Sequence, residues 1–321
     1  MKKAKKFIAL LLTLVFVAAM ISCGKNQEQG HIHKIGVLVY DLKDEQVQAF
    51  REYLEGYIAA NFSDVDFLYS SEVTTEEEEM EFLNSAIAEG VEGVLAFNSF
   101  DLEKEVSLCA EKGVYFIRPS STTAPEDFDK VADNPYFLGY FGPGSEMEYQ
   151  AGYDMGSYFA KEQISDSYFL LNGGAGANVM HEQRAEGMLD ALQEAYGVQF
   201  EQSSAELASA SEPVSVEAEG LKVTIFPGYI SALEVGQQAI AEYKKDPAGV
   251  VMSTIPVLPI ASSLGDASLG TVDCYTESNG ELFKNGNLKY LCGKYESIIG
   301  PAFAAMYNAV TGYSEDFRED G

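Results

Sequence analysis

The sequence has no tryptophan and little cysteine or histidine. Its 321 residues include only four cysteines and three histidines. Four cysteines are too few for a disulfide scaffold in a chain of this length. The sequence also contains no Gly-x-Ser-x-Gly, His-Glu-x-x-His or Cys-x-x-Cys signature, which the common serine hydrolases, zinc proteases and thiol oxidoreductases require. We therefore expect a protein that is not an enzyme.

Basic residues are also scarce. The chain has 21 Lys and Arg against 50 Asp and Glu, which gives a formal net charge of −29 at pH 7. A field of this sign repels phosphate backbones, so we expect no nucleic-acid partner. Apolar residues make up 46% of the chain, which is enough for a packed core.

One long apolar run is present, and it lies at the N-terminus. Residues 7–21 are apolar apart from a single threonine and follow four lysines, a pattern typical of an export signal. The run is shorter than the roughly 20 residues of a spanning helix, which favours a cleaved signal peptide over a transmembrane anchor. Residues 20–23 resemble the lipobox of bacterial lipoproteins. That resemblance implies a signal peptide over 1–22 and fatty acylation, palmitate included, of Cys23. Several fatty chains would tether the protein to a membrane outside the cytoplasm.

The remaining cysteines and the two N-terminal histidines are not expected to form a catalytic or metal site. Cys109 lies on an apolar helical face, and we expect it to be a buried small hydrophobe. Cys274 and Cys292 fall on two expected strands and could pair if those strands are neighbours, or remain free thiols. Residues 23–33 are polar and predict a flexible tether. His31 and His33 lie there without a nearby carboxylate or thiol, so we expect no metal.

From residue 34 onward, short apolar runs alternate with longer amphipathic stretches. This alternation predicts repeated βα units, which form parallel sheets covered by helices on both faces. The series restarts near residue 142, which indicates two lobes divided there. Residues 202–220 are rich in Ser, Ala and Glu and predict a surface insertion without fixed structure. The expected strands are 35–40, 65–69, 94–97, 114–117, 136–141, 168–171, 221–226, 249–253, 271–275 and 288–292. A helix is expected over 44–60, with Phe50 on its apolar stripe, and another over 179–196, with His181 on a solvated face and Arg184 pairing or packing on the helix itself.

Several short segments, taken in order, resemble one family. The chain is similar to type I periplasmic solute-binding proteins of ABC sugar importers, the ribose- and galactose-binding group. The resemblance covers about residues 34–313 and rests on segments 35–40, 90–98, 149–152, 173–176, 183–187 and 282–286. It implies a two-lobed α/β fold that closes at a hinge over a small polar solute. It also implies that the lobes are built from discontinuous chain, 34–142 with 296–321 and 143–295. It also implies delivery to an ABC permease, a monomer and no cofactor. The family's chain crosses between the lobes three times, and its final strand would begin about at Gly321.

Candidate ligand-binding residues follow from the fold class. Ligands of parallel α/β sheets bind beyond the carboxyl ends of the strands, where Asp, Asn and Tyr can pair with hydroxyl-rich solutes. By position, the resemblance implies ligand contacts from Tyr40, Asp44, Asn98 and Ser120 in the first lobe and from Thr254, Asp273 and Lys294 in the second. Asp41, in the loop that follows Tyr40, is expected to contribute as well. The chain has Glu182 and Thr254-Ile255 where the relatives carry Arg and Asn-Asp. These departures favour a ligand whose polarity differs from that of a standard pentose or hexose.

Two other functions fit the same fold. The protein could present its ligand to a membrane receptor as a sensing module. It could also be a structural surface lipoprotein whose cleft is vestigial and filled by side chains. A nucleotide cofactor is not expected, because Val179 stands where the third glycine of a dinucleotide fingerprint would follow Gly174 and Gly176.

Overall fold

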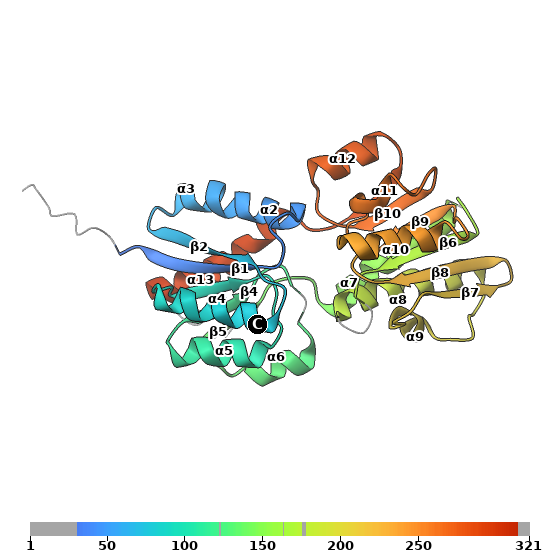
Figure 1. The fold of residues 1–321 in the computed structure, drawn as a ribbon. Coiled ribbons are helices and arrows are strands. Elements are labelled where there is room, and N and C mark those ends of the chain that lie inside the picture. Colours follow the sequence, from blue (N-terminus) through green and yellow to red (C-terminus); the bar gives the residue numbers. More distant parts are fainter. Residues whose placement is uncertain (1–30, 122, 163, 175–177, 314–321) are drawn as a thin grey trace, which may run out of the picture.

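A computed structural model describes residues 31–313, apart from 122, 163 and 175–177. It has two α/β lobes lying next to each other (Figure 1). The predicted signal peptide, Cys23 and most of the predicted tether lie outside the described residues. Among the residues that are described, no helix is both long and apolar enough to cross a membrane.

The first lobe is built on a five-stranded parallel sheet in the order β2-β1-β3-β4-β5. Its strands are short apolar runs because helices cover both faces. The two faces bury separate clusters, one under α2 and α13 and the other under α4 and α5. The strands are β1 (His33–Val39), β2 (Val65–Glu72), β3 (Gly93–Ala96), β4 (Tyr115–Arg118) and β5 (Phe137–Tyr140); the helices are α4 (Glu76–Ala88), α5 (Leu102–Glu111), α6 (Pro125–Val131) and α13 (Ile299–Thr311).

Local sequence signals explain where these helices begin. Thr75 and Glu78 form a capping box at the start of α4, and four glutamates occupy its first turn, where the helix dipole favours negative charge. The single helix expected over 44–60 is instead three pieces. Asp44 caps α2 (Glu45–Glu52), and a π-helical stretch, η1 (Tyr53–Ile58), and α3 (Ala59–Asn61) follow.

The second lobe contains a six-stranded sheet in the order β11-β10-β9-β6-β8-β7. All its pairs are parallel except the edge pair β7–β8, which is antiparallel, so the expectation of a fully parallel sheet was incomplete here. The strands are β6 (Ser167–Asn172), β7 (Val214–Ala218), β8 (Leu221–Pro227), β9 (Val250–Ser253), β10 (Ser268–Val272) and β11 (Leu288–Cys292); the helices are α7 (Ser145–Lys161), α8 (Val179–Tyr196), α9 (Ser204–Ala208), α10 (Leu233–Tyr243), α11 (Leu258–Ala261) and α12 (Glu277–Lys284).

The prediction that residues 202–220 lack fixed structure was wrong. This segment contains α9, which opens with a Ser203–Glu206 capping box, and β7, which pairs with β8. Leu207 of α9 is buried in the core of the lobe. The three apolar residues of β7 alternate with polar ones and pack against the same core. The Ser- and Glu-rich composition concealed this period-two pattern.

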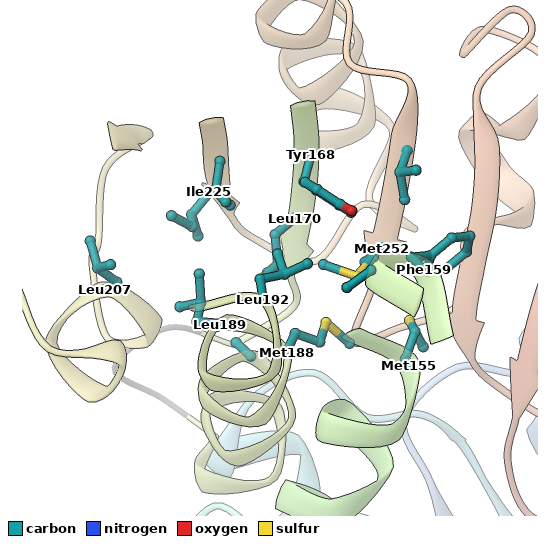
Figure 2. Packing of buried hydrophobic residues seen from close by; sticks show 14 of the residues in the cluster. Met155, Phe159, Tyr168, Leu170, Met188, Leu189, Leu192, Leu207, Ile225 and Met252 are labelled. Atoms are coloured by element: carbon teal, nitrogen blue, oxygen red, sulfur yellow. The ribbon is translucent and has the colours of Figure 1, made fainter. Parts of the chain in front are cut away.

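Helices α7 and α8 cross at very close range. A Cβ atom on Gly152 would lie 1.9 Å from the carbonyl oxygen of Arg184, and one on Gly187 would lie 2.1 Å from that of Tyr149. This approach brings the apolar side chains of both helices onto the sheet. Figure 2 shows them packing there with Tyr168, Leu170, Ile225 and Met252.

The chain returns to the first lobe after β11. Helix α13 contacts β3, β4 and β5, and its Phe303 and Met306 are buried in the core of that lobe. Two connections therefore join the lobes among the described residues, one between β5 and α7 and one between β11 and α13. The cleft between the lobes is bounded by segments that are far apart in the sequence.

The cysteines within the described residues are free thiols. Cys109 is fully buried, as expected. The strands that were expected to carry Cys274 and Cys292 are indeed neighbours. However, β10 ends at Val272, which pairs with Cys292. Cys274 lies two residues beyond the strand and is not bonded to Cys292.

Candidate ligand-binding site

A cavity of about 480 Å³ lies between the two lobes, at the carboxyl ends of their strands. Its volume is within the range of about 300–1,000 Å³ that is typical of small-molecule sites. Both lobes supply its walls, and polar and aromatic side chains are mixed along them. The first lobe contributes Tyr40, Asp44, Gln46, Phe50, Phe97, Asn98, Ser99, Arg118, Ser120 and Ser121; the second lobe and its return segment contribute Gly173, Gly174, Asn178, Met180, His181, Arg184, Tyr229, Ile255, Pro256, Val272, Asp273, Gly293 and Lys294.

Most of the residues expected from the sequence line this cavity. They are Tyr40, Asp44, Asn98, Ser120, Asp273 and Lys294.

Asp41 and Thr254 do not line the cavity. The Asp41 carboxylate accepts a hydrogen bond from the Lys43 backbone (2.7 Å) and stabilises its own turn. Thr254 is fully buried beneath the cavity, where its hydroxyl accepts from the Gly173 backbone (3.0 Å). Both side chains therefore support the backbone of the protein, Asp41 within its own turn and Thr254 across to the Gly173 loop.

Two phenylalanines form an apolar wall in the first lobe. The rings of Phe50, on α2, and Phe97, just after β3, lie with centroids 5.2 Å apart and planes 17° from parallel. Both line the cavity. Such a flat apolar surface suits the C–H face of a ring-shaped ligand, while nearby polar groups can reach its edges.

Beside this wall, several buried polar atoms have no hydrogen-bond partner within the described part of the chain. They are Asn98 Oδ1, Arg118 Nε and the hydroxyls of Ser120 and Ser121. A buried unsatisfied donor or acceptor costs about 1–3 kcal/mol. Ser120 also has a φ of 56°, a left-handed conformation that non-glycine residues adopt at a cost. These unpaired groups all line the same cavity.

A pair of buried carboxyl groups supports the loop that carries Asn98. Glu79 accepts from the Asn98 amide (3.3 Å) and from the Phe100 backbone (2.9 Å). Glu105 accepts from the backbone of Phe100 (3.0 Å) and Asp101 (2.9 Å). Burial, together with a hydrogen bond to Glu105, raises the pKa of Glu79 to about 9. The raised pKa favours the protonated form of Glu79, which reduces the repulsion between the two carboxyl groups.

In the second lobe, a buried ion pair stands behind the cavity. Arg184 Nε donates to Glu148 Oε2 at 2.5 Å, and Arg184 Nη1 donates to the Thr254 carbonyl oxygen at 2.7 Å. His181, expected on a solvated helix face, is instead buried. Its Nδ1 lies 3.2 Å from the same carbonyl oxygen. Burial, with the Arg184 charge as a second cause, lowers the pKa of His181 to about 3, so the imidazole is neutral.

Two oppositely charged groups lie on the same side of the cavity. Burial raises the pKa of Asp273 to about 6, although hydrogen bonds from Asn279 and the Cys274 backbone, both 2.6 Å, oppose the shift. Burial, followed by the Arg184 charge, lowers the pKa of Lys294 to about 8. Each group is held where its charged form is poorly solvated and would gain from a polar ligand.

Among the described residues, three side-chain hydrogen bonds join the two lobes. The Tyr229 hydroxyl donates to Asp44 Oδ2 (3.5 Å), and the Ser278 hydroxyl donates to Glu45 Oε1 (2.6 Å). Lys294 Nζ donates to the Ser120 carbonyl oxygen (3.1 Å). The Asp44 carboxyl group, which caps α2, also faces Tyr229, and burial raises its pKa.

Sequence reasoning did not place several cavity residues in the site. Phe50 had been assigned only to the apolar stripe of its helix, and Arg184 only to pairing or packing on its own helix. Phe97 was part of an expected strand, which in the structure ends one residue earlier, at Ala96. The position of Phe97 directly after a strand was the one local signal that could have identified it.

No protein-family model and no curated protein sequence matches the chain. Solved structures share its fold across nearly the whole length. A periplasmic solute-binding protein of an ABC transporter from Actinobacillus succinogenes, with bound D-allose, has a TM-score of 0.67 and 14% identity over 87% of this chain and 92% of its own. A carbohydrate transporter from Acidothermus cellulolyticus, in complex with myo-inositol, has a TM-score of 0.63 and 16% identity over 91% and 90%. A candidate LacI transcriptional regulator from Bacteroides fragilis has a TM-score of 0.63 and 14% identity over 89% and 93%.

These similarities identify the two-lobed fold of type I periplasmic binding proteins and confirm the predicted fold class. These two structures are described as a solute-binding protein and a carbohydrate transporter.

Proposed function

We propose that this protein is an extracytoplasmic solute-binding protein that captures a small polar ligand, a sugar or a sugar-like molecule, in the cavity between its lobes. The observation that carries the proposal is the set of unpaired polar atoms on Asn98, Arg118, Ser120 and Ser121. A ligand with several hydroxyl groups would satisfy these donors and acceptors while its ring packs on Phe50 and Phe97. The solved relatives with D-allose and myo-inositol support this ligand class.

Both lobes supply polar groups, so ligand binding is coupled to how the lobes approach each other. Asn98 and Arg118 belong to the first lobe, and Asp273 follows a strand of the second. A ligand that contacts both sides stabilises the approached arrangement by its difference in affinity for the two arrangements. A cavity of roughly 480 Å³ is open between the lobes, which argues against the alternative of a vestigial cleft that side chains fill. The fold by itself does not select sugar transport, since the candidate LacI regulator shares it.

The proposal is tested by isothermal titration calorimetry against a panel of pentoses, hexoses, cyclitols and nucleosides. We expect one panel member to bind with 1:1 stoichiometry. Asp273→Asn should weaken its binding by about tenfold or more, because a hydrogen bond to a charged group contributes about 1.5–3 kcal/mol. Asp129→Asn, at an exposed aspartate outside the cavity, is the matched control and should bind as the parent does. A folded protein that binds no panel member, or equal affinity in the two variants, would contradict the assignment.

We also propose that Cys23 anchors the protein to a membrane, from which it delivers the ligand to an ABC permease. The lipobox-like residues 20–23 support this, and several acyl chains are needed for stable anchoring. Labelling cells with a palmitate analogue should mark the parent and a Cys292→Ala variant but not Cys23→Ala. Labelling of Cys23→Ala, or no labelling of the parent, would refute the anchor. Uptake of the ligand should fall when the gene is deleted and return with the parent gene.

A further inference from the structure

Two histidines and a glutamate meet at the start of the first strand, at the end of the lobe away from the ligand cavity (Figure 1). His31 Nε2 lies 2.7 Å from Glu92 Oε1, and His33 Nδ1 lies 3.0 Å from Glu92 Oε2. One potential ligand atom from each of the three residues lies within 4.8 Å of the others. The sequence shows the two histidines but not the carboxylate, which is 59 residues further along the chain than His33.

The parallel sheet holds these side chains together. His31 and His33 are two residues apart, so in an extended chain they project to the same side. The two rings are in edge contact, with centroids 4.6 Å apart. Glu92 directly precedes β3, and its backbone N–H donates to the Lys34 carbonyl oxygen of β1 (2.8 Å). The pairing of β1 with β3 therefore places this carboxylate beside both imidazoles.

His33 is also fixed from its other side. Its backbone N–H donates to the Asp64 carbonyl oxygen (2.8 Å), and its ring contacts Tyr307 edge-on. The Tyr307 hydroxyl donates to the Asp64 carboxylate (2.9 Å). The His33 side chain is only 12% exposed, whereas that of His31 is 68% exposed. The site therefore combines one largely buried imidazole, one partly exposed carboxylate and one exposed imidazole.

We propose that His31, His33 and Glu92 form a binding site for a divalent transition metal of the Zn²⁺ class. Two imidazoles and one carboxylate are a donor set that this class of metal accepts, with a fourth position open to water. Zn²⁺ binds nitrogen and oxygen ligands at about 2.0–2.2 Å, so tetrahedral ligands lie roughly 3.3 Å apart. The 4.8 Å limit on the present separations leaves at most about 1.5 Å to close, which rotation of the exposed His31 side chain supplies.

Metal binding is expected to cross-link two segments of the first lobe at the end of the sheet away from the cavity. The metal would join His31, which precedes β1, to the turn before β3. The position of the chain entering β1 would then be fixed relative to the lobe. Because the site and the ligand cavity are at opposite ends of the sheet, this proposal does not depend on the proposed function.

The test is zinc binding by the full-length chain, purified in detergent without a histidine tag and stripped with a chelator. Equilibrium dialysis and competition with a chromophoric chelator measure stoichiometry and affinity, and Zn²⁺ alone is the probe. We expect one tight equivalent, and binding that is at least about tenfold weaker in His31→Gln and Glu92→Gln. Glu89→Gln removes an exposed carboxylate three residues from Glu92 and should bind zinc as the parent does.

Thermal unfolding provides a second readout. The melting temperature of the parent should rise with zinc, because an ion that binds only the folded state stabilises it. His31→Gln should unfold at the parent temperature in chelator but lose the zinc-induced rise. The inference is overturned if the parent binds no stoichiometric zinc. It is also overturned if His31→Gln and Glu92→Gln retain parental zinc affinity, which would assign binding to cysteines or to the acidic surface.

Discussion

Replacement of Glu148 by glutamine should severely destabilise the second lobe. The glutamine keeps the volume and can still accept from Arg184 Nε, so the change removes charge without creating a cavity. The Arg184 and Glu148 side chains are only 6% and 2% exposed. Two unit charges about 4 Å apart attract each other by roughly 4 kcal/mol at an effective dielectric constant near 20. A buried charge left without its partner costs about 3–5 kcal/mol.

Thermal unfolding followed by circular dichroism measures this loss. One kcal/mol corresponds to about 2–4 °C for a unit of 150–250 residues, so we expect the melting temperature to fall by about 6–20 °C. Glu242→Gln is the matched control because it breaks an exposed pair with Lys245, and it should cost less than about 1 kcal/mol.

A double variant distinguishes charge burial from loss of packing. Glu148→Leu combined with Arg184→Met removes both charges and should recover most of the stability that Glu148→Gln loses, because apolar replacement of a buried pair is often neutral. If Glu148→Gln melts within about 2 °C of the parent, or if the double variant is less stable than the single one, the reasoning about the buried pair is refuted.

Three further predictions concern pH, helix packing and the contact between lobes. Burial raises the folded-state pKa of Glu79 from 4.5 to about 9, so the stability that Glu79 contributes should be greatest below pH 4.5 and be lost as pH rises toward 9. Glu79→Gln should therefore make the melting temperature depend less on pH between pH 5 and 9. Glu81→Gln, at an exposed position, should keep the pH dependence of the parent. Gly187→Ala should destabilise the protein by about 1–3 kcal/mol or more in urea unfolding, because the added Cβ would lie 2.1 Å from the Tyr149 carbonyl oxygen. Gly56→Ala, whose Cβ would have no atom within 4 Å, should be neutral or slightly stabilising. Equal stabilities of the two variants would contradict the close crossing of α7 and α8. Ser278→Ala should weaken ligand binding by at most about tenfold, because it removes one hydrogen bond of about 0.5–1.5 kcal/mol between the lobes; calorimetry that finds a much larger loss would show that Ser278 contacts the ligand itself.

The repeating pattern of the sequence was sufficient to predict the architecture. Short apolar runs such as 94–97 and 168–171 predicted buried strands, and the structure places β3 and β6 there. The pattern failed at 202–220, where composition suggested disorder and a hairpin was found. It also placed one strand too late, since β10 ends at Val272. Both errors arose where weak local preference was overridden by packing onto a neighbouring strand.

The site was only partly accessible from the sequence. Residues directly after strands, such as Asn98, Asp273 and Lys294, could be expected in the cavity because the carboxyl ends of parallel strands share one edge. Asp41 is instead occupied within its own turn, by the backbone of Lys43. The role of Thr254 could not be predicted, because its hydroxyl is occupied by the Gly173 backbone, which only the folded chain brings close. His181 was misjudged for the same reason, since it is buried by the Thr254 loop.

The sequence by itself determined the alternation of strands and helices, the acidic surface and the positions where ligand contacts could occur. These properties depend on residues close together in the chain. Only the tertiary structure decided which distant groups meet: Phe50 with Phe97, Glu148 with Arg184, and Glu92 with two histidines. The reason is physical, because a side chain acquires its pKa, its hydrogen-bond partners and its accessibility from atoms that strand register and helix crossing bring within a few ångströms.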